Sequence, residues 1–279
     1  MTAYELKAWS LADLYSGLEN DDLKADLNKL DRVVDEVMGY REKLNDSTTV
    51  SLFREFLKKY EELITLTTRL SSFTGLLFSG YSQDPKIIAA VGKIDALWAE
   101  IQSKTIFASL WWKNLADEKA EAFLNDLPDY RYFLTQLRQT KKYTLSEKEE
   151  QIVSMKNVSG VAALQSLYSM ITNRYEFELE LNGEMKKMTR GQLGQYVRDP
   201  DPDVRRRAYE EMYRVYEKDS SILTQIYQAL VRDWDSEGMT IRGYESPISI
   251  RNVQNDIPDE VVNLLLDKAQ ENKDIFQRY

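Results

Sequence analysis

Apolar side chains recur every three or four positions along most of this chain, the spacing that gathers them on one face of an α-helix. Residues 21–44 carry such a stripe, with two aspartates in the first turn, where the helix dipole favours negative charge. Comparable stripes cover 52–81 and 85–110, the latter opened by an Asp-Pro pair. These helices are expected to be about 25–35 residues long, against a usual mean of about 12. Long helices with short connections predict an antiparallel, elongated helical lobe.

Shorter helices are expected further along the chain. Pro128 opens a helical pattern that reaches residue 142. Ser146 with Glu149, and Thr189 with Gln192, have the spacing of a capping box, in which two side chains satisfy free N–H groups at a helix start. Each pair therefore predicts a helix beginning at that point.

Glycine, proline and serine predict where the remaining helices stop. Residues 158–160 (Val-Ser-Gly) are expected to interrupt the helix that starts near 146. The run Asp-Pro-Asp-Pro-Asp at 199–203 predicts a turn that caps one long helix over 204–238. Residues 239–257 are expected to form an extended loop, and a last helix begins at Pro258.

A single segment alternates with period two. Residues 175–181 alternate apolar or aromatic with acidic side chains, and Asn-Gly follows at 182–183. Because both positions of a tight hairpin turn need positive φ, Asn-Gly between alternating arms predicts one small β-hairpin near 175–189. Its exposed face is expected to set Glu178 and Glu180 against Lys186 and Lys187. The predicted fold class is thus all-α with one hairpin.

Composition and charge exclude several partners. The 279 residues include 37 Lys and Arg against 46 Asp and Glu, a net charge of −9. An acidic protein repels phosphate backbones, so no nucleic-acid partner is expected. No run of about 18 apolar residues occurs, and no basic-then-apolar leader is visible at the start. We therefore expect no membrane contact and a cytoplasmic location.

The chain contains no cysteine and no histidine. Disulfides are excluded, as are Ser–His–Asp and Cys–His sites and histidine-ligated zinc. Only carboxylates, lysine, arginine, tyrosine and hydroxyl side chains remain for chemistry.

Two charged runs have simpler explanations than a binding site. The arginines at 205–207 could bind an anion, but Arg206 with Glu210 and Arg207 with Glu211 form i,i+4 pairs typical of a solvated helix face. Asp199, Asp201 and Asp203 have the alternation of a calcium loop. That loop's glycine and twelfth-position glutamate are missing, so a capped turn is expected instead.

The aromatic and acidic clusters are likewise assigned to structure. Trp111 and Trp112 are expected to anchor packing near a helix end. Core packing, rather than a ligand-binding wall, is expected for Tyr209, Tyr213, Tyr216 and Tyr227. The strongest carboxylate cluster, at a predicted solvated helix end, is Asp233, Asp235 and Glu237. Their i,i+2 spacing spreads them around a helix, so they cannot converge on one metal.

Several blocks of the chain resemble, in the same order, the sequence pattern of a known protein family. In residues 132–153 the matching residues are Leu134, Leu137, Arg138, Leu145, Ser146, Glu147, Glu149 and Glu150. In residues 232–279 they are Arg242-Gly243-Tyr244, Pro247, Arg251-Asn252, Asp256-Ile257 and Val261. Residues 205–213 and the opening stretch at 4–15 fit the same order. With these blocks the chain resembles the oligoendopeptidase F branch of the M3 zinc metallopeptidase family.

The resemblance implies a peptidase that this chain cannot complete. The family holds zinc with H-E-x-x-H on a helix and a downstream glutamate, and its motif lies beyond residue 279 of a protein about twice this length. Since the chain has no histidine, it is expected to be the N-terminal half, a fragment without catalytic, cofactor-binding or metal-binding residues. Its partners would be the C-terminal half and short peptide substrates, with zinc in the whole protein only, and the chain alone is expected to be inactive.

The resemblance also implies an organisation. Residues 1–115 would be a long-helix arm and 116–190 a helical segment with the hairpin, together one wall of a substrate channel; 191–279 would begin the catalytic domain. A cut there would leave the last helix with an exposed apolar face that includes Val261, Leu265 and Phe276. Two alternatives stay open: a stand-alone helical scaffold or interaction protein, and an enzyme using lysine, tyrosine or carboxylates alone.

Overall fold

The computed structural model describes residues 9–278 and confirms the all-α class with one small hairpin. The first three helices form the largest part of the molecule: α1 (Asp21–Met38), α2 (Val50–Gly80) and α3 (Pro85–Asn114). Each helix has an N-cap residue whose side chain accepts a hydrogen bond from a backbone N–H of the first turn; these residues are Asn20, Thr49 and Asp84.

The first helix is shorter than the sequence predicts. It has 18 residues and ends at Met38, where Gly39 is the C-cap, whereas α2 and α3 have 31 and 30 residues. Leu44, predicted on the helical stripe, lies in the turn after the helix but is still buried. The apolar pattern therefore located a buried position but not the helix end.

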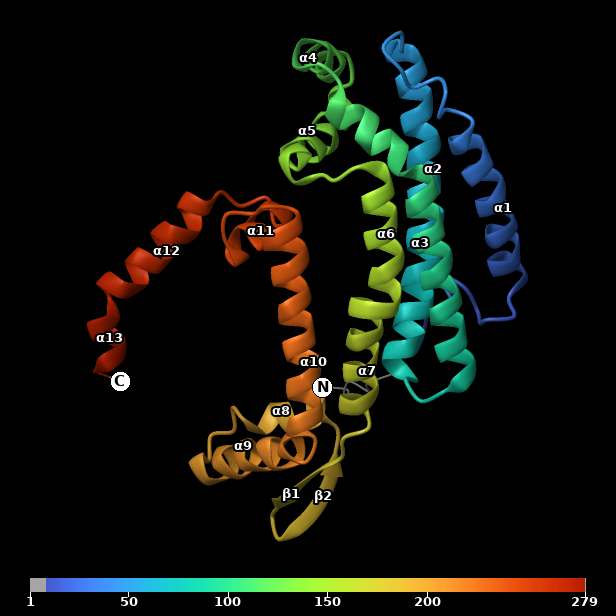
Figure 1. Ribbon diagram of the computed structural model, residues 1–279. Helices are drawn as coiled ribbons and strands as arrows, with labels where there is room; N and C mark the ends of the chain where they lie inside the picture. Colours follow the sequence, from blue (N-terminus) through green and yellow to red (C-terminus); the bar gives the residue numbers. More distant parts are fainter. Residues whose placement is uncertain (1–8, 279) are drawn as a thin grey trace, which may run out of the picture.

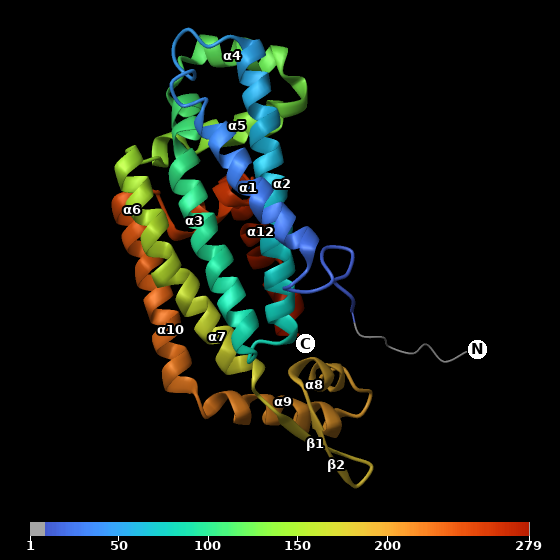
Figure 2. The ribbon, with the colours of Figure 1, turned by 90° about the vertical axis from the view of Figure 1, so that its right-hand side faces the viewer.

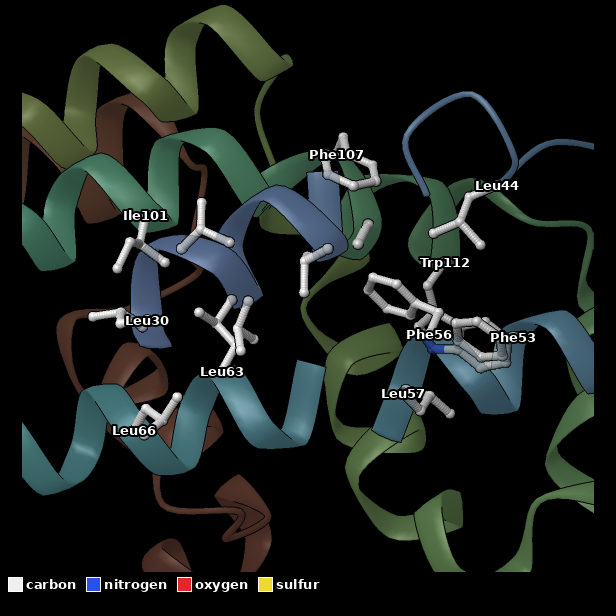
Figure 3. Packing of buried hydrophobic residues seen from close by; sticks show 14 of the residues in the cluster. Leu30, Leu44, Phe53, Phe56, Leu57, Leu63, Leu66, Ile101, Phe107 and Trp112 are labelled. Atoms are coloured by element: carbon white, nitrogen blue, oxygen red, sulfur yellow. The ribbon is translucent and has the colours of Figure 1, made fainter. Parts of the chain in front are cut away.

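Aromatic and aliphatic side chains from these helices form the main hydrophobic core (Figure 3). The rings of Phe53 and Trp112 stack with centroids 5.4 Å apart. The Trp112 indole N–H donates to the Leu134 carbonyl at 2.8 Å, which satisfies the polar atom of a side chain only 1% exposed. Trp111 and Trp112 thus anchor packing near the end of α3, as predicted.

Shorter helices continue the chain: α4 (Asp117–Asp126), η1 (Pro128–Tyr130), α5 (Arg131–Gln139), η2 (Lys141–Tyr143), α6 (Glu147–Asn157) and α7 (Ala163–Asn173). The capping box at Ser146 and Glu149 is confirmed. The predicted interruption at 158–160 is a π-helical turn, η3 (Val158–Ala162), that joins α6 to α7 without breaking the helix.

The hairpin consists of β1 (Phe177–Leu181) and β2 (Glu184–Met188). Asn182 and Gly183 both have positive φ, 55° and 81°, as the turn requires. Glu178 lies opposite Lys187, as expected, but the register sets Lys186 against Leu179 and Glu180 against Met185. The charge pairing was thus right for Lys187 and wrong for Lys186, because a side chain one position along points to the other face.

A second, smaller hydrophobic cluster joins the hairpin to α8 (Arg190–Tyr196) and α9 (Pro202–Glu217). Its centre contains Phe177, Leu193 and Ala208, each at most 1% exposed. The Thr189–Gln192 capping box is confirmed at the start of α8.

The long helix predicted over 204–238 is wrong, because the chain turns at Lys218 and Asp219. The Asp219 carboxylate accepts hydrogen bonds from Tyr175 at 2.9 Å and Arg174 at 3.3 Å, which tie the turn to the end of α7 and the start of the hairpin. Beyond it lie α10 (Ser220–Asp233) and the π-helix η4 (Trp234–Ile241).

The extended loop predicted over 239–257 is also wrong. It holds the end of η4 and a short helix, α11 (Pro247–Gln254), which is capped by Ser246. The predicted last helix is two, α12 (Asp259–Glu271) and α13 (Lys273–Gln277), separated at Asn272.

The helices stand side by side: α1 packs on α2, α2 on α3 and α3 on α6, while α10 contacts α7 (Figures 1 and 2). The α4–α5 region lies at one end of this row and the hairpin with α8 and α9 at the other. The arm formed by α12 and α13 projects away from the body on the side opposite α1. Across residues 9–278, every helix is too short or too polar to cross a bilayer.

Candidate functional site

Two adjoining cavities of about 570 and 530 Å³ lie where α3, α6 and η3 face η4. Side chains from all four elements line both cavities, so the two share one wall: Ile106, Ser109, Glu150, Asn157, Val161, Glu237 and Arg242. The charged members of this wall, Glu150, Glu237 and Arg242, interact with one another.

Arg242 is the centre of that wall. Its guanidinium donates to both carboxylate oxygens of Glu150 at 2.8 and 2.9 Å, to Glu237 at 2.8 Å and to the Tyr143 carbonyl at 3.1 Å. The three charged side chains are only 13–24% exposed. We call Glu150, Glu237 and Arg242 the charged triad; it ties α6 to the end of η4.

Pairing shifts the pKa values of Glu150 and Arg242. Hydrogen bonds from Arg242 hold the pKa of Glu150 below its usual value, although burial alone would raise it. The same bond to Glu150 raises the pKa of Arg242 further above its already high value. Both shifts favour the charged forms of Glu150 and Arg242.

Other side chains pack and form hydrogen bonds around the triad. Tyr143 and Tyr244 stack with ring centroids 3.6 Å apart, and Asn157 donates to the second Glu237 oxygen at 3.5 Å. Lys113 donates to Thr144 at 2.9 Å, and burial lowers its pKa. Asn157 directly precedes η3 and Glu237 lies within η4, so two π-helical segments meet at this site.

The chemistry open to this arrangement is limited. Arg242 uses four of its five N–H donors on two carboxylates and a carbonyl, and its partners are held as hydrogen-bond acceptors. Residues 9–278 contain no group of three histidine, cysteine or acidic side chains placed to hold a metal ion. The triad thus serves to join elements and to shape the wall of the cavities.

The predicted charged runs behave mostly as expected. Arg206 pairs with Glu210 at 3.6 Å on the surface of α9, and Asp201 caps that helix by accepting from the Asp203 N–H. The second predicted pair is wrong: Arg207 is half-buried with its Nη2 3.5 Å from the Glu180 carbonyl. Glu211 instead binds Arg214 and the backbone N–H of Glu178, because the hairpin packs on that side of α9.

The expectation that four tyrosines pack in the core is wrong for three of them. Tyr209, Tyr213 and Tyr227 are 56%, 55% and 68% exposed. Only Tyr216 packs inward, with its ring centroid 5.0 Å from that of Tyr175. The turn at Asp219 places Tyr227 on a different helix, α10, whereas Tyr209 and Tyr213 lie on a side of α9 that no other element of residues 9–278 covers.

The acidic cluster at 233–237 is also only partly as expected. Asp235 is exposed, but Glu237 is half-buried and belongs to the charged triad. The sequence contained a weak signal for this, since Glu150 and Arg242 both lie in blocks that carry the family pattern. Nothing in their spacing of 92 positions indicated that they pair.

This chain resembles known peptidases. A family described as Oligopeptidase F matches residues 111–177. The chain is 22% identical over 280 residues to Group B oligopeptidase PepB from Streptococcus agalactiae and 23% identical to an oligoendopeptidase F homolog from Borreliella burgdorferi. Each alignment covers 97% of this chain but 45% of the relative. The chain therefore spans about half the length of these curated relatives.

Solved structures share the fold. The crystal structure of oligoendopeptidase-F from Enterococcus faecium matches 92% of this chain and 51% of its own, with a TM-score of 0.76 and 18% identity. That of a putative peptidase from Chlamydophila abortus matches 97% of this chain and 46% of its own, with a TM-score of 0.60 and 17% identity.

The fold is thus that of the N-terminal half of a peptidase architecture. The family resemblance expected from the sequence is confirmed: the chain corresponds to the N-terminal half of the oligoendopeptidase F proteins.

Proposed function

We propose that this chain is the N-terminal part of a cytoplasmic zinc metallo-oligoendopeptidase that hydrolyses short peptides. In this proposal the segment carries no catalytic residue and forms one wall of the substrate channel. The observation that supports it is the alignment of almost the whole chain with slightly less than half of each peptidase relative.

The residues of this chain do not fit the zinc that such a peptidase needs. Histidine and cysteine are absent from the whole chain, and residues 9–278 offer no metal-binding cluster of acidic side chains. Zinc and the water it activates would therefore be held by the half that this chain does not span, and this chain takes no step in bond cleavage.

The proposed contribution of this half is shape. Residues 1–115 and 116–190 would form the wall and 191–279 would begin the catalytic domain. The charged triad would fix the wall, since it joins Glu150 in the second part to Glu237 and Arg242 in the third. A rigid wall would admit unfolded oligopeptides and exclude folded proteins.

The test begins with the gene. We expect the reading frame to continue beyond codon 279 to an H-E-x-x-H motif, and the whole product to cleave a fluorogenic peptide in a zinc-dependent way. The 279-residue chain should show no cleavage with added zinc. A stop codon after residue 279 would favour the alternative, a stand-alone helical scaffold, and zinc-dependent cleavage by the short chain would contradict the proposal.

A further inference from the structure

We propose that the apolar face of α12 and α13 is a docking surface for the segment that follows residue 279 in the complete protein. This inference rests on the proposed function and specifies where the two halves meet. The surface consists of six large side chains, 53–72% exposed: Val261, Leu264, Leu265, Leu266, Ile275 and Phe276.

The exposed face is too apolar to be an ordinary solvated surface. An amphipathic helix normally buries its apolar stripe against another element. The described residues of α12 and α13 include none that is buried. Covering a side chain of this size stabilises a structure by about 1.5–3 kcal/mol, so a partner would gain substantially from docking here.

The base of the arm holds it in a defined direction. The Asp259 carboxylate, at the start of α12, accepts from Ser249 at 2.9 Å and from Asn252 at 2.8 Å. Just before it, Asp256 accepts from Tyr132 and Gln136 of α5, both at 2.8 Å. The face is therefore presented in a fixed orientation, which lowers the entropic cost of docking.

The charges beside the face argue against a lipid surface. Helices that lie on anionic membranes carry a polar side rich in lysine and arginine. Here acidic residues outnumber basic ones, with Asp259, Glu260, Asp267, Glu271 and Asp274 against Lys268 and Lys273. A second copy is also disfavoured, because each chain carries a net charge of −9.

The comparisons favour a following segment as the occupant. This chain aligns with 45% of each of two relatives and with 51% of a solved chain, so about half of each lies outside the aligned part. The arm is the last described element and projects from the body (Figure 1).

Thiol reactivity tests this directly, because the chain has no cysteine of its own. Leu265→Cys and Phe276→Cys are made singly in the 279-residue chain and in the whole product of its gene, with any cysteine beyond residue 279 replaced by serine. The rate of reaction with 5,5′-dithiobis(2-nitrobenzoate) is measured. Tyr81→Cys is the control, since Tyr81 is 64% exposed at the end of α2, away from the arm.

We expect at least a tenfold fall in the rates at 265 and 276 in the whole protein and no change at 81. Equal rates in the two proteins would overturn the inference, as would a stop codon after residue 279. So would concentration-dependent protection in the short chain, which would indicate a second copy, or protection by phosphatidylglycerol–phosphatidylcholine vesicles. Peptide cleavage is assayed separately, so protection without cleavage would reject the proposed activity and leave the docking surface standing.

Discussion

Arg242 connects parts of the chain that are far apart in sequence. Its side chain spans α6 and η4 through Glu150 and Glu237 and also holds the Tyr143 carbonyl. A buried ion pair is costly to desolvate, and removing one partner leaves an uncompensated charge. Each member of the triad therefore matters more for stability than any exposed ion pair of α9.

Replacing Glu150 with glutamine is expected to lower the free energy of unfolding by about 2–3 kcal/mol, because hydrogen bonds to a charged group are lost at a site of low exposure. Urea unfolding followed by circular dichroism measures the change. Glu210→Gln is the matched control on an exposed pair and should cost less than about 0.5 kcal/mol. Equal effects of the two substitutions would show that the triad contributes little.

The same residue predicts a pH dependence. Because the pKa of Glu150 is lowered in the folded state, its stabilisation is present above the ordinary glutamate pKa of about 4.3 and is lost as pH falls through the folded value. The difference in unfolding free energy between wild type and Glu150→Gln should be constant from about pH 5.5 to 8 and shrink below about pH 4. A difference that stays constant at acid pH would contradict this assignment.

Side-chain environments were the least predictable features from the sequence. Spacing located the stripe of tyrosines on α9 but not the exposure of Tyr209 and Tyr213, because a stripe does not reveal whether a partner covers it. Glu150 and Arg242 resemble many other charges in the chain, and their pairing depends on the tertiary fold. The absence of histidine, by contrast, determines the limits on chemistry before any fold is known.

At the scale of elements, η4 and α11 approach each other closely at Gly238. A Cβ atom added there would lie 2.3 Å from the Cδ1 of Ile250, a side chain that is 5% exposed. A larger residue at position 238 therefore requires the buried Ile250 side chain to move. Glycine at this position thus allows the π-helix to pass near the helix that follows it.

Gly238→Ala is expected to cost about 1–3 kcal/mol through overpacking, partly offset by the better helix propensity of alanine. Ile250→Val removes the clashing Cδ1 and alone should cost about 0.5–1.5 kcal/mol. The double variant should lose less stability than the sum of the single variants. Strict additivity in the unfolding free energies would show that the two positions do not meet as described.

Long helices and local caps were predictable because their signals lie within a few residues. The starts of α2 and α3, the hairpin turn and both capping boxes follow from such signals. The turn at Asp219 was missed because it is held by Tyr175 and Arg174, more than 40 positions earlier. The interruption at 158–160 was located but its π-helical form was not, and α11 was missed because its apolar residues do not keep a regular helical period.

At the scale of the whole molecule, residues 9–278 contain two separate hydrophobic clusters. The larger one includes side chains from Tyr15 to Leu134 and the smaller one from Phe177 to Val215. Between them, α6, α7 and α10 connect the ends of the row (Figure 1). Two clusters without shared members are expected to open independently.

Leu193→Ala should therefore loosen one end of the molecule only. Leu193 is fully buried in the smaller cluster, and its truncation should cost about 2–5 kcal/mol there. Amide hydrogen exchange should speed up in 177–217 and stay unchanged in α2 and α3. Leu63→Ala, in the larger cluster, is the reciprocal control, and faster exchange throughout in both variants would indicate a single cooperative unit.

The sequential packing of α1 on α2 and of α2 on α3 has a consequence for how the protein is made. Both α2 and α3 pack on the helix that directly precedes them in the chain, and contacts between near neighbours form fast. The larger cluster is complete once Leu134 has left the ribosome, before the hairpin and α9 are translated. Translation from the N-terminus thus delivers a folded platform first, on which the later helices assemble in turn.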